Sequence, residues 1–160
     1  MSKYQTISDL AIKNTALFFE NRKKAAGYAF EVLEAIEDYL EPPDRNTIAI
    51  VHIRQDKSEE VVDKVILLMN KMRTDDPRRY NEFTCGIQFN FNSQNLGTSS
   101  SVYLQIIVAD KKCKIFGETF DISDKRGIGS SAFVFLKNKY DTNNEKPSIG
   151  FVNSTRSDRT

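Results

Sequence analysis

The clearest pattern of hydrophobic positions lies in the first third of the chain. From residue 25 to residue 40, apolar residues recur at the spacings of an amphipathic helix: Ala25, Ala29, Val32, Leu33, Ile36 and Leu40. A looser run of the same kind precedes it, from Ile7 to Phe19. The polar stretch 20–24 is either a turn between two helices or one face of a single long helix. Pro42-Pro43 is expected to end the helical segment.

Two further elements are predicted before residue 80. The β-branched run from Thr47 to Ile53 is too short for a helix and indicates a strand buried on both faces. Ser58 is expected to open a helix, which Asp75-Asp76-Pro77 would close. The apolar stripe of that helix comprises Val61, Val62, Val65, Ile66, Leu68, Met69 and Met72.

From about residue 82 the hydrophobic period changes to that of a strand. Residues 83–92 alternate strictly, with apolar residues at the odd positions and polar residues or glycine at the even ones. Further strands are predicted at 101–109, 113–122 and 132–136, and 149–152 is a candidate edge strand. We therefore expect a four- to five-stranded antiparallel meander.

These elements predict an α+β fold with helices packed on one face of a curved sheet. The order is a helical N-terminal segment, a strand, a helix and then the meander. It resembles cystatin-like and NTF2-like folds by analogy of element order alone. The length of 160 residues fits one domain, which we place at 1–152, followed by a disordered tail at 153–160.

Composition excludes several functional classes. The formal net charge is +1, which demands neither a nucleic acid nor an anionic membrane as partner. The longest apolar runs are five residues and no signal-peptide core is present, so we expect no membrane span and a cytoplasmic protein. One histidine, His52, and two cysteines, Cys85 and Cys113, cannot form a paired-histidine centre or a closed zinc site. We expect these three side chains to be buried, and no cofactor or metal.

A metal-dependent nuclease is a remote alternative. Asp110-Lys111-Lys112 at a predicted strand end resembles the D-x-K element of such enzymes. A working site needs at least one further carboxylate to hold Mg²⁺, and Glu82 and Glu118 are the candidates. The tripeptide is common by chance, so we favour a protein without catalytic activity.

The segment 123–131 carries two glycines, several hydroxyl groups and two cations. It is either a nest of backbone N–H groups that binds an anion or a plain hairpin loop before the strand at 132–136. Seven bases against three acids over 111–139 suggest a basic patch, with Tyr103 and Tyr140 as stacking aromatics. This nucleotide- or nucleic-acid-binding alternative uses Lys112, Lys114, Lys125, Arg126, Gly127, Gly129 and Ser130.

The polar face of the meander is uncharged and rich in amides. Its members are Gln88, Asn90, Asn92, Tyr103 and Gln105. Such a face can hydrogen-bond a partner without the desolvation penalty of charge, and Tyr is enriched at interfaces. Our leading hypothesis is therefore a non-catalytic intracellular protein-binding module, such as an adaptor, an immunity protein or a phage-type inhibitor.

Leu17-Phe18-Phe19 places apolar side chains on nearly every side of one helical turn. This is more apolar surface than one packed helix face needs. We therefore expect a homodimer with the N-terminal segment at the interface.

Overall fold

The N-terminal segment is one continuous helix in the computed structural model, which describes residues 2–71, 82–93 and 97–141. Helix α1 spans Lys3–Leu40, and its 38 residues extend over about 57 Å at 1.5 Å per residue. The Ser2 side chain caps the start by accepting a hydrogen bond from the Gln5 N–H group. Glu41 adopts a left-handed conformation just before Pro42-Pro43, so the helix ends where the prolines predict.

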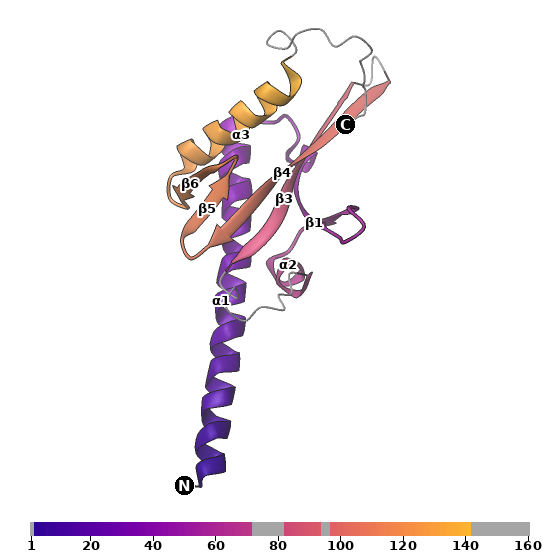
Figure 1. Ribbon diagram of the computed structural model, residues 1–160. Coiled ribbons are helices and arrows are strands. Elements are labelled where there is room, and N and C mark those ends of the chain that lie inside the picture. The colour runs from indigo at the N-terminus through magenta and orange to yellow at the C-terminus, as the bar shows by residue number, and fades with distance from the viewer. Residues whose placement is uncertain (1, 72–81, 94–96, 142–160) are drawn as a thin grey trace.

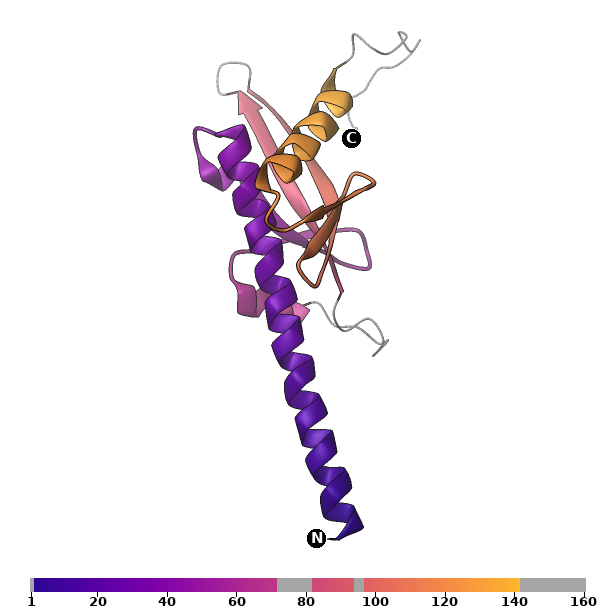
Figure 2. The ribbon, with the colours of Figure 1, turned by 90° about the vertical axis from the view of Figure 1, so that its left-hand side faces the viewer.

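Helix α1 has a buried half and a projecting half (Figures 1 and 2). Residues 3–20 extend beyond the body of the molecule, and we call this segment the N-terminal arm. In the arm, Ser8 and Phe18 are half-buried and every other side chain is exposed. Burial begins after the arm, and the buried residues are Arg22, Ala25, Ala26, Ala29, Val32, Ala35 and Ile36.

Six antiparallel strands form one sheet beside the buried half of α1, in the order β2-β1-β3-β4-β5-β6 (Figure 1). A 3-10 turn, η1 (Arg45–Thr47), leads into the first strand. The strands are β1 (Ile48–Ile53), β2 (Glu59–Val62), β3 (Phe83–Ser93), β4 (Thr98–Ala109), β5 (Lys112–Ile115) and β6 (Glu118–Asp121). The β3–β4 ladder is the longest, with 11 residue pairs, and the strict alternation over 83–92 predicts it correctly.

The segment after β1 differs from the expectation, because residues 59–62 are strand β2 rather than the first turn of a helix. β2 turns back along β1, so that Val61 pairs with Val51, and β-branched side chains suit this strand pair. Lys57 has a φ of 71° in the connecting turn, where Asp56 accepts hydrogen bonds from Ser58. The helix that follows, α2, spans only Val65–Lys71. Its expected end at 75–77 lies outside the described residues.

The strand predicted over 113–122 is divided into β5 and β6. Phe116 and Gly117 separate the two strands, and both have positive φ, 49° and 84°. Two central residues with positive φ form the turn that best matches the twist of a two-residue hairpin. The apolar residues alternate without interruption across this turn, so the sequence pattern alone predicts one strand where the chain in fact reverses direction.

Residues 132–136 are wrongly predicted as a strand, because they lie within helix α3, Lys125–Tyr140. The segment 123–131 is the start of this helix rather than a hairpin loop. Asp124 is the N-cap, and its Oδ1 accepts a hydrogen bond from the Gly127 N–H group at 3.0 Å. Gly129 faces α1, where an added Cβ would overlap the Cβ of Tyr39. The candidate strand 149–152 and the tail 153–160 lie outside the described residues.

One cluster of buried side chains joins α1, α2 and α3 to the sheet. It contains Ile36 from α1, Leu68 from α2, Ile128 from α3 and the inward-facing residues of the strands, such as Ile87 and Ile106. The helices therefore cover the apolar face of the antiparallel sheet, and the predicted α+β class is confirmed.

Candidate binding surfaces

Four of the polar residues predicted to bind a partner lie on the face of the sheet opposite the helices. Ile87 and Phe89 are buried beneath the helices, so the alternate residues Gln88 and Asn90 face away from them. Gln88 Nε2 donates to Glu59 Oε1 at 2.9 Å, and Asn90 Nδ2 donates to Gln88 Oε1 at 3.0 Å. These hydrogen bonds hold the two amides in a fixed row.

Tyr103 and Gln105 continue this face on β4, where both are exposed. Gly86, on the neighbouring strand, makes room for the Tyr103 ring, because a Cβ there would lie 3.2 Å from Tyr103 Cδ2. The ring remains 38% exposed. Asn92, the fifth predicted residue, is exposed farther along β3. We call the surface formed by Gln88, Asn90, Tyr103 and Gln105 the polar sheet face.

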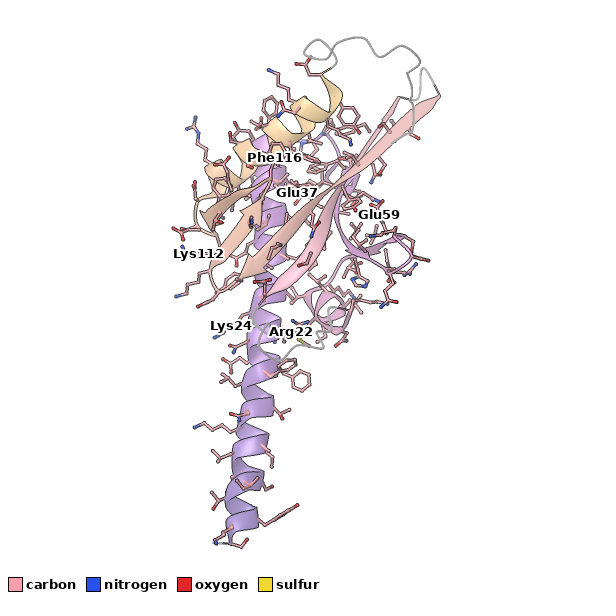
Figure 3. All side chains as sticks on the ribbon, viewed as in Figure 1. Arg22, Lys24, Glu37, Glu59, Lys112 and Phe116 are labelled. Atoms are coloured by element: carbon pink, nitrogen blue, oxygen red, sulfur yellow. The ribbon has the colours of Figure 1, made fainter. Side chains whose placement is uncertain are left out.

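The basic residues of the alternative site lie on two different sides of the molecule. Cys113 of β5 is buried beneath the helices, so the neighbouring Lys112 and Lys114 project from the opposite face of the sheet (Figure 3 labels Lys112). Lys125 and Arg126 are exposed at the start of α3, in the helix layer. These four cations therefore do not form one surface.

Two of these cations are already paired with carboxylates. Lys112 Nζ lies 3.0 Å from Asp121 Oδ1, and Lys125 Nζ lies 3.9 Å from Glu34 Oε1. Tyr140, proposed as a stacking aromatic, has its hydroxyl within 2.9 Å of Ser100 Oγ. An incoming phosphate would have to compete with these contacts.

Gly127, Gly129 and Ser130 lie inside the first turns of α3 and do not form a loop. The Gly127 N–H group is bound by Asp124, and the Ile128 N–H group donates to the Asp124 carbonyl oxygen. Gly129 is buried where α3 meets α1. The open nest of backbone N–H groups predicted for this segment is therefore replaced by a capped helix.

The candidate catalytic residues do not belong to any group of three potential metal ligands in the described part of the chain. Among residues 2–71, 82–93 and 97–141, no three His, Cys, Asp or Glu side chains are grouped so that they could hold a metal ion. Asp110, Glu82 and Glu118 are therefore not grouped together as three ligands, and the metal-dependent nuclease stays a remote alternative. His52 is half-buried on β1 rather than buried, and it lies opposite Glu60 of β2.

Cys85 and Cys113 are free thiols inside the core, as predicted. Burial raises the pKa of Cys85 to about 12, because its thiolate would lie in an apolar environment. Burial also raises the pKa of Cys113 to about 11, with a smaller contribution from the charge of Asp124. The reactive thiolate form is therefore suppressed at neutral pH.

The N-terminal arm exposes more large apolar side chains than any other element. Tyr4 is 81% exposed, and Ile7, Leu10, Ile12, Leu17 and Phe19 are between 49% and 66% exposed. Figure 3 shows the N-terminal part of α1 projecting away from the sheet with its side chains. At the base of the arm, the Arg22 guanidinium lies 5.8 Å from the centre of the Phe18 ring, and burial lowers the pKa of Arg22.

A groove of about 780 Å³ lies at the other end of α1, and sequence analysis missed it. It is bounded by residues 40–48, by the end of β3 and by α3. These segments are far apart in the sequence, and one of them was expected to be a strand. Phe91 marks the groove in the structure: the alternation correctly places it on the core face of β3, but the alternation did not indicate that it would be 45% exposed.

Comparison of the chain with protein-family models, with curated proteins and with solved structures found no match. Within the part of the chain that the structure describes, no helix combines the length and the apolar character needed to cross a membrane.

Proposed function

We propose that the chain is a non-catalytic protein-binding module that forms a homodimer through its N-terminal arm. The exposure of the arm carries this proposal. Burying a large apolar side chain stabilises a protein by about 1.5–3 kcal/mol. The arm leaves six of them in contact with water, and two of these, Tyr4 and Ile7, lie on the face defined below. Most of the stability of helices in proteins also comes from packing of an apolar face rather than from helix propensity.

One face of the arm continues the face by which α1 enters the core. Residues 4, 7, 11 and 18 are apolar and follow the spacings of three, four and seven that residues 25, 29, 32 and 36 continue in the body. At about 100° per residue these positions form one stripe along the helix. We call the stripe formed by Tyr4, Ile7, Ala11 and Phe18 the arm face.

An antiparallel second copy fits this face best. The arm face points to the same side of α1 as the sheet, so two parallel chains would bring their bodies into the same space. In an antiparallel pair, each arm lies along the other and each body lies beyond the tip of its partner's arm. Such a pair is two-fold symmetric and closed, the commonest arrangement of homodimers.

The distribution of charge along α1 supports the same orientation. Residues 3–24 contain five bases and two acids, whereas residues 25–41 contain five acids and no base. Parallel pairing would place like charges side by side over both halves. Antiparallel pairing of the arms alone keeps the acidic residues 25–41 of the two chains at opposite ends of the pair, so this repulsion is avoided.

The proposal leaves the polar sheet face as a second protein-binding surface, because its amides are held in place and one aromatic ring is accessible. The nucleotide- or nucleic-acid-binding alternative has less support, since its cations lie on two sides of the molecule. We also propose a cytoplasmic location, which the two free thiols favour because oxidising compartments promote disulfides.

Sedimentation of two matched variants tests the dimer. Ile7 and Ile12 are 64% and 66% exposed, but they lie about 140° apart around the helix, so only Ile7 belongs to the arm face. We expect a dimer at micromolar concentration. Ile7→Lys should raise its dissociation constant at least tenfold, because two-fold symmetry would bury two unpaired charges. Ile12→Lys is the control and should leave the dissociation constant of the dimer unchanged. A monomer at 200 µM, or equal effects of the two variants, would overturn the proposal.

A further inference from the structure

The groove at the C-terminal end of α1 is concave, apolar and held open by fixed walls. Its volume of about 780 Å³ is in the range of ligand-binding sites. Tyr140 holds the end of α3 to the β3–β4 hairpin, through an edge-on contact with Phe91 at 5.5 Å and a hydrogen bond to Ser100. The apolar lining residues are Leu40, Pro43, Phe89, Phe91, Phe133 and Leu136.

One wall of the groove is an edge of β3 that no strand of the described residues covers. β3 pairs with β1 only as far as the pair Ile48↔Phe89, whereas its pairing with β4 continues to Ser93↔Thr98. Among the described residues, no strand pairs with residues 90–93 on the β1 side. Figure 1 shows the end of this hairpin running beyond the rest of the sheet. An edge of this kind presents N–H and C=O groups that can pair with another strand.

The chain leading into β1 lies beside this edge without pairing with it. Pro42 and Pro43 have no N–H group to donate, and residues 45–47 form the 3-10 turn η1 instead of extending β1. The groove therefore lies between residues 40–48 and residues 89–92, so that a segment bound in it runs beside the edge of β3.

We propose that this groove binds an extended apolar segment of a partner protein, which adds as a strand to the free edge of β3. The strand edge selects an extended backbone, because it offers hydrogen bonds at the spacing of a strand. The aromatic and aliphatic walls select apolar side chains at alternate positions of that segment. The site is at the opposite end of α1 from the N-terminal arm, so it is independent of the dimer interface.

The charges at the rim indicate a basic flank on the bound segment. Glu41 and Asp44, which line the groove, are both exposed. Glu37 and Asp38 lie nearby on α1, and Arg45 pairs with both of them at 3.4 and 2.8 Å. Lys137 is a cation on the groove lining. The four acidic side chains of residues 37–45 still outnumber Arg45 and Lys137, and this excess complements lysine or arginine.

A designed peptide is a suitable probe. We would measure fluorescence anisotropy of the labelled peptide Lys-Phe-Thr-Val-Thr-Phe-Lys with the full chain, and follow hydrogen exchange at residues 90–93. The control peptide has the same side chains and an N-methyl group on every internal amide. We expect saturable binding of the first peptide, at least tenfold weaker binding of the methylated one, and slower exchange in β3.

Two adjacent residues of α3 provide a matched pair of variants. Phe133 and Val134 are 45% and 42% exposed, but only Phe133 lines the groove. Phe133→Ala should weaken peptide binding at least tenfold, as expected for a central aromatic anchor. Val134→Ala should change it less than twofold. Equal effects of the two variants would overturn the proposal.

Other occupants of the groove give different results. Equal binding of the methylated peptide would indicate a pocket for apolar groups without strand addition, and no binding at all would indicate no peptide site. If only the full chain carrying Ile149→Ser and Phe151→Ser bound the peptide, the native occupant would be the chain's own C-terminal segment. Each of these results overturns a partner strand as the ligand.

Discussion

Cys85 shows how position in the fold controls the chemistry of a single residue. Its side chain lies in the centre of the sheet and is only 2% exposed, and burial raises its pKa to about 12. An unfolded thiol titrates near pH 8.5. Cys113 lies in the same core, and burial raises its pKa to about 11. Both thiols are therefore structural groups, and neither is a candidate nucleophile.

The raised thiol pKa predicts a loss of stability in alkaline solution. Above about pH 8.5 the unfolded chain releases protons that the folded chain retains, so the free energy of unfolding falls as the pH rises. Each thiol contributes up to about 1.4 kcal/mol per pH unit until the pH reaches its folded pKa. Urea denaturation in reductant between pH 8 and pH 10.5 measures this slope. We expect a shallower decline in Cys85→Ala, and parallel declines in the two proteins would contradict the account.

Among the elements, those with long uninterrupted patterns were predicted and those with short ones were not. Repeated spacing over residues 25–40 and strict alternation over 83–92 each persist for several turns or residue pairs, so α1 and β3 were recognised. Helix α3 was missed because the run Ala132–Leu136 is apolar and follows two glycines, which suggested a loop and a strand. The spacing of Ile128, Ala132 and Leu136, four residues apart, was the helical signal that could have identified it.

The candidate binding surfaces were predictable to different degrees. The polar sheet face was predicted from the alternation of polar and apolar residues along two neighbouring strands. Four of the five predicted residues do lie together. The arm was recognised as too apolar, but its projection could not be derived, because the length of α1 beyond the sheet depends on tertiary packing. The groove depends on α3 and on the point where β1 stops pairing with β3. No local pattern in the sequence specifies that point.

Two glycines in the helices are expected to respond in opposite ways to substitution by alanine, because one lies in the contact between α1 and α3 and the other has open space around it. Gly129 lies against Tyr39, so Gly129→Ala should lower the free energy of unfolding by about 1–3 kcal/mol through overpacking. Gly27 has open space around it within α1, so Gly27→Ala should raise stability by up to about 1 kcal/mol through helix propensity. Urea denaturation at equal protein concentration compares the two variants. A more stable Gly129→Ala protein would contradict the close helix contact.

At the scale of the whole molecule, α1 connects two separate candidate surfaces. Its N-terminal arm carries the proposed dimer interface, and its C-terminal end forms part of the groove. In an antiparallel dimer the two grooves would lie at opposite ends of the assembly. A dimer of this shape could hold two partner segments far apart, and its span would be set by the length of α1.

The distance between spin labels on Lys24 of two copies tests the antiparallel dimer most directly. Lys24→Cys labels an exposed position at the base of the arm, and both native thiols are buried. If the arms cross near residue 11, the two labels lie 13 residues from the crossing point on each side, about 40 Å apart along the helices. We predict a pulsed electron resonance distance near that value at 100 µM protein, lost in Ile7→Lys and retained in Ile12→Lys. A distance below about 25 Å would indicate parallel arms, and no intermolecular distance would indicate a monomer; either result would contradict the account.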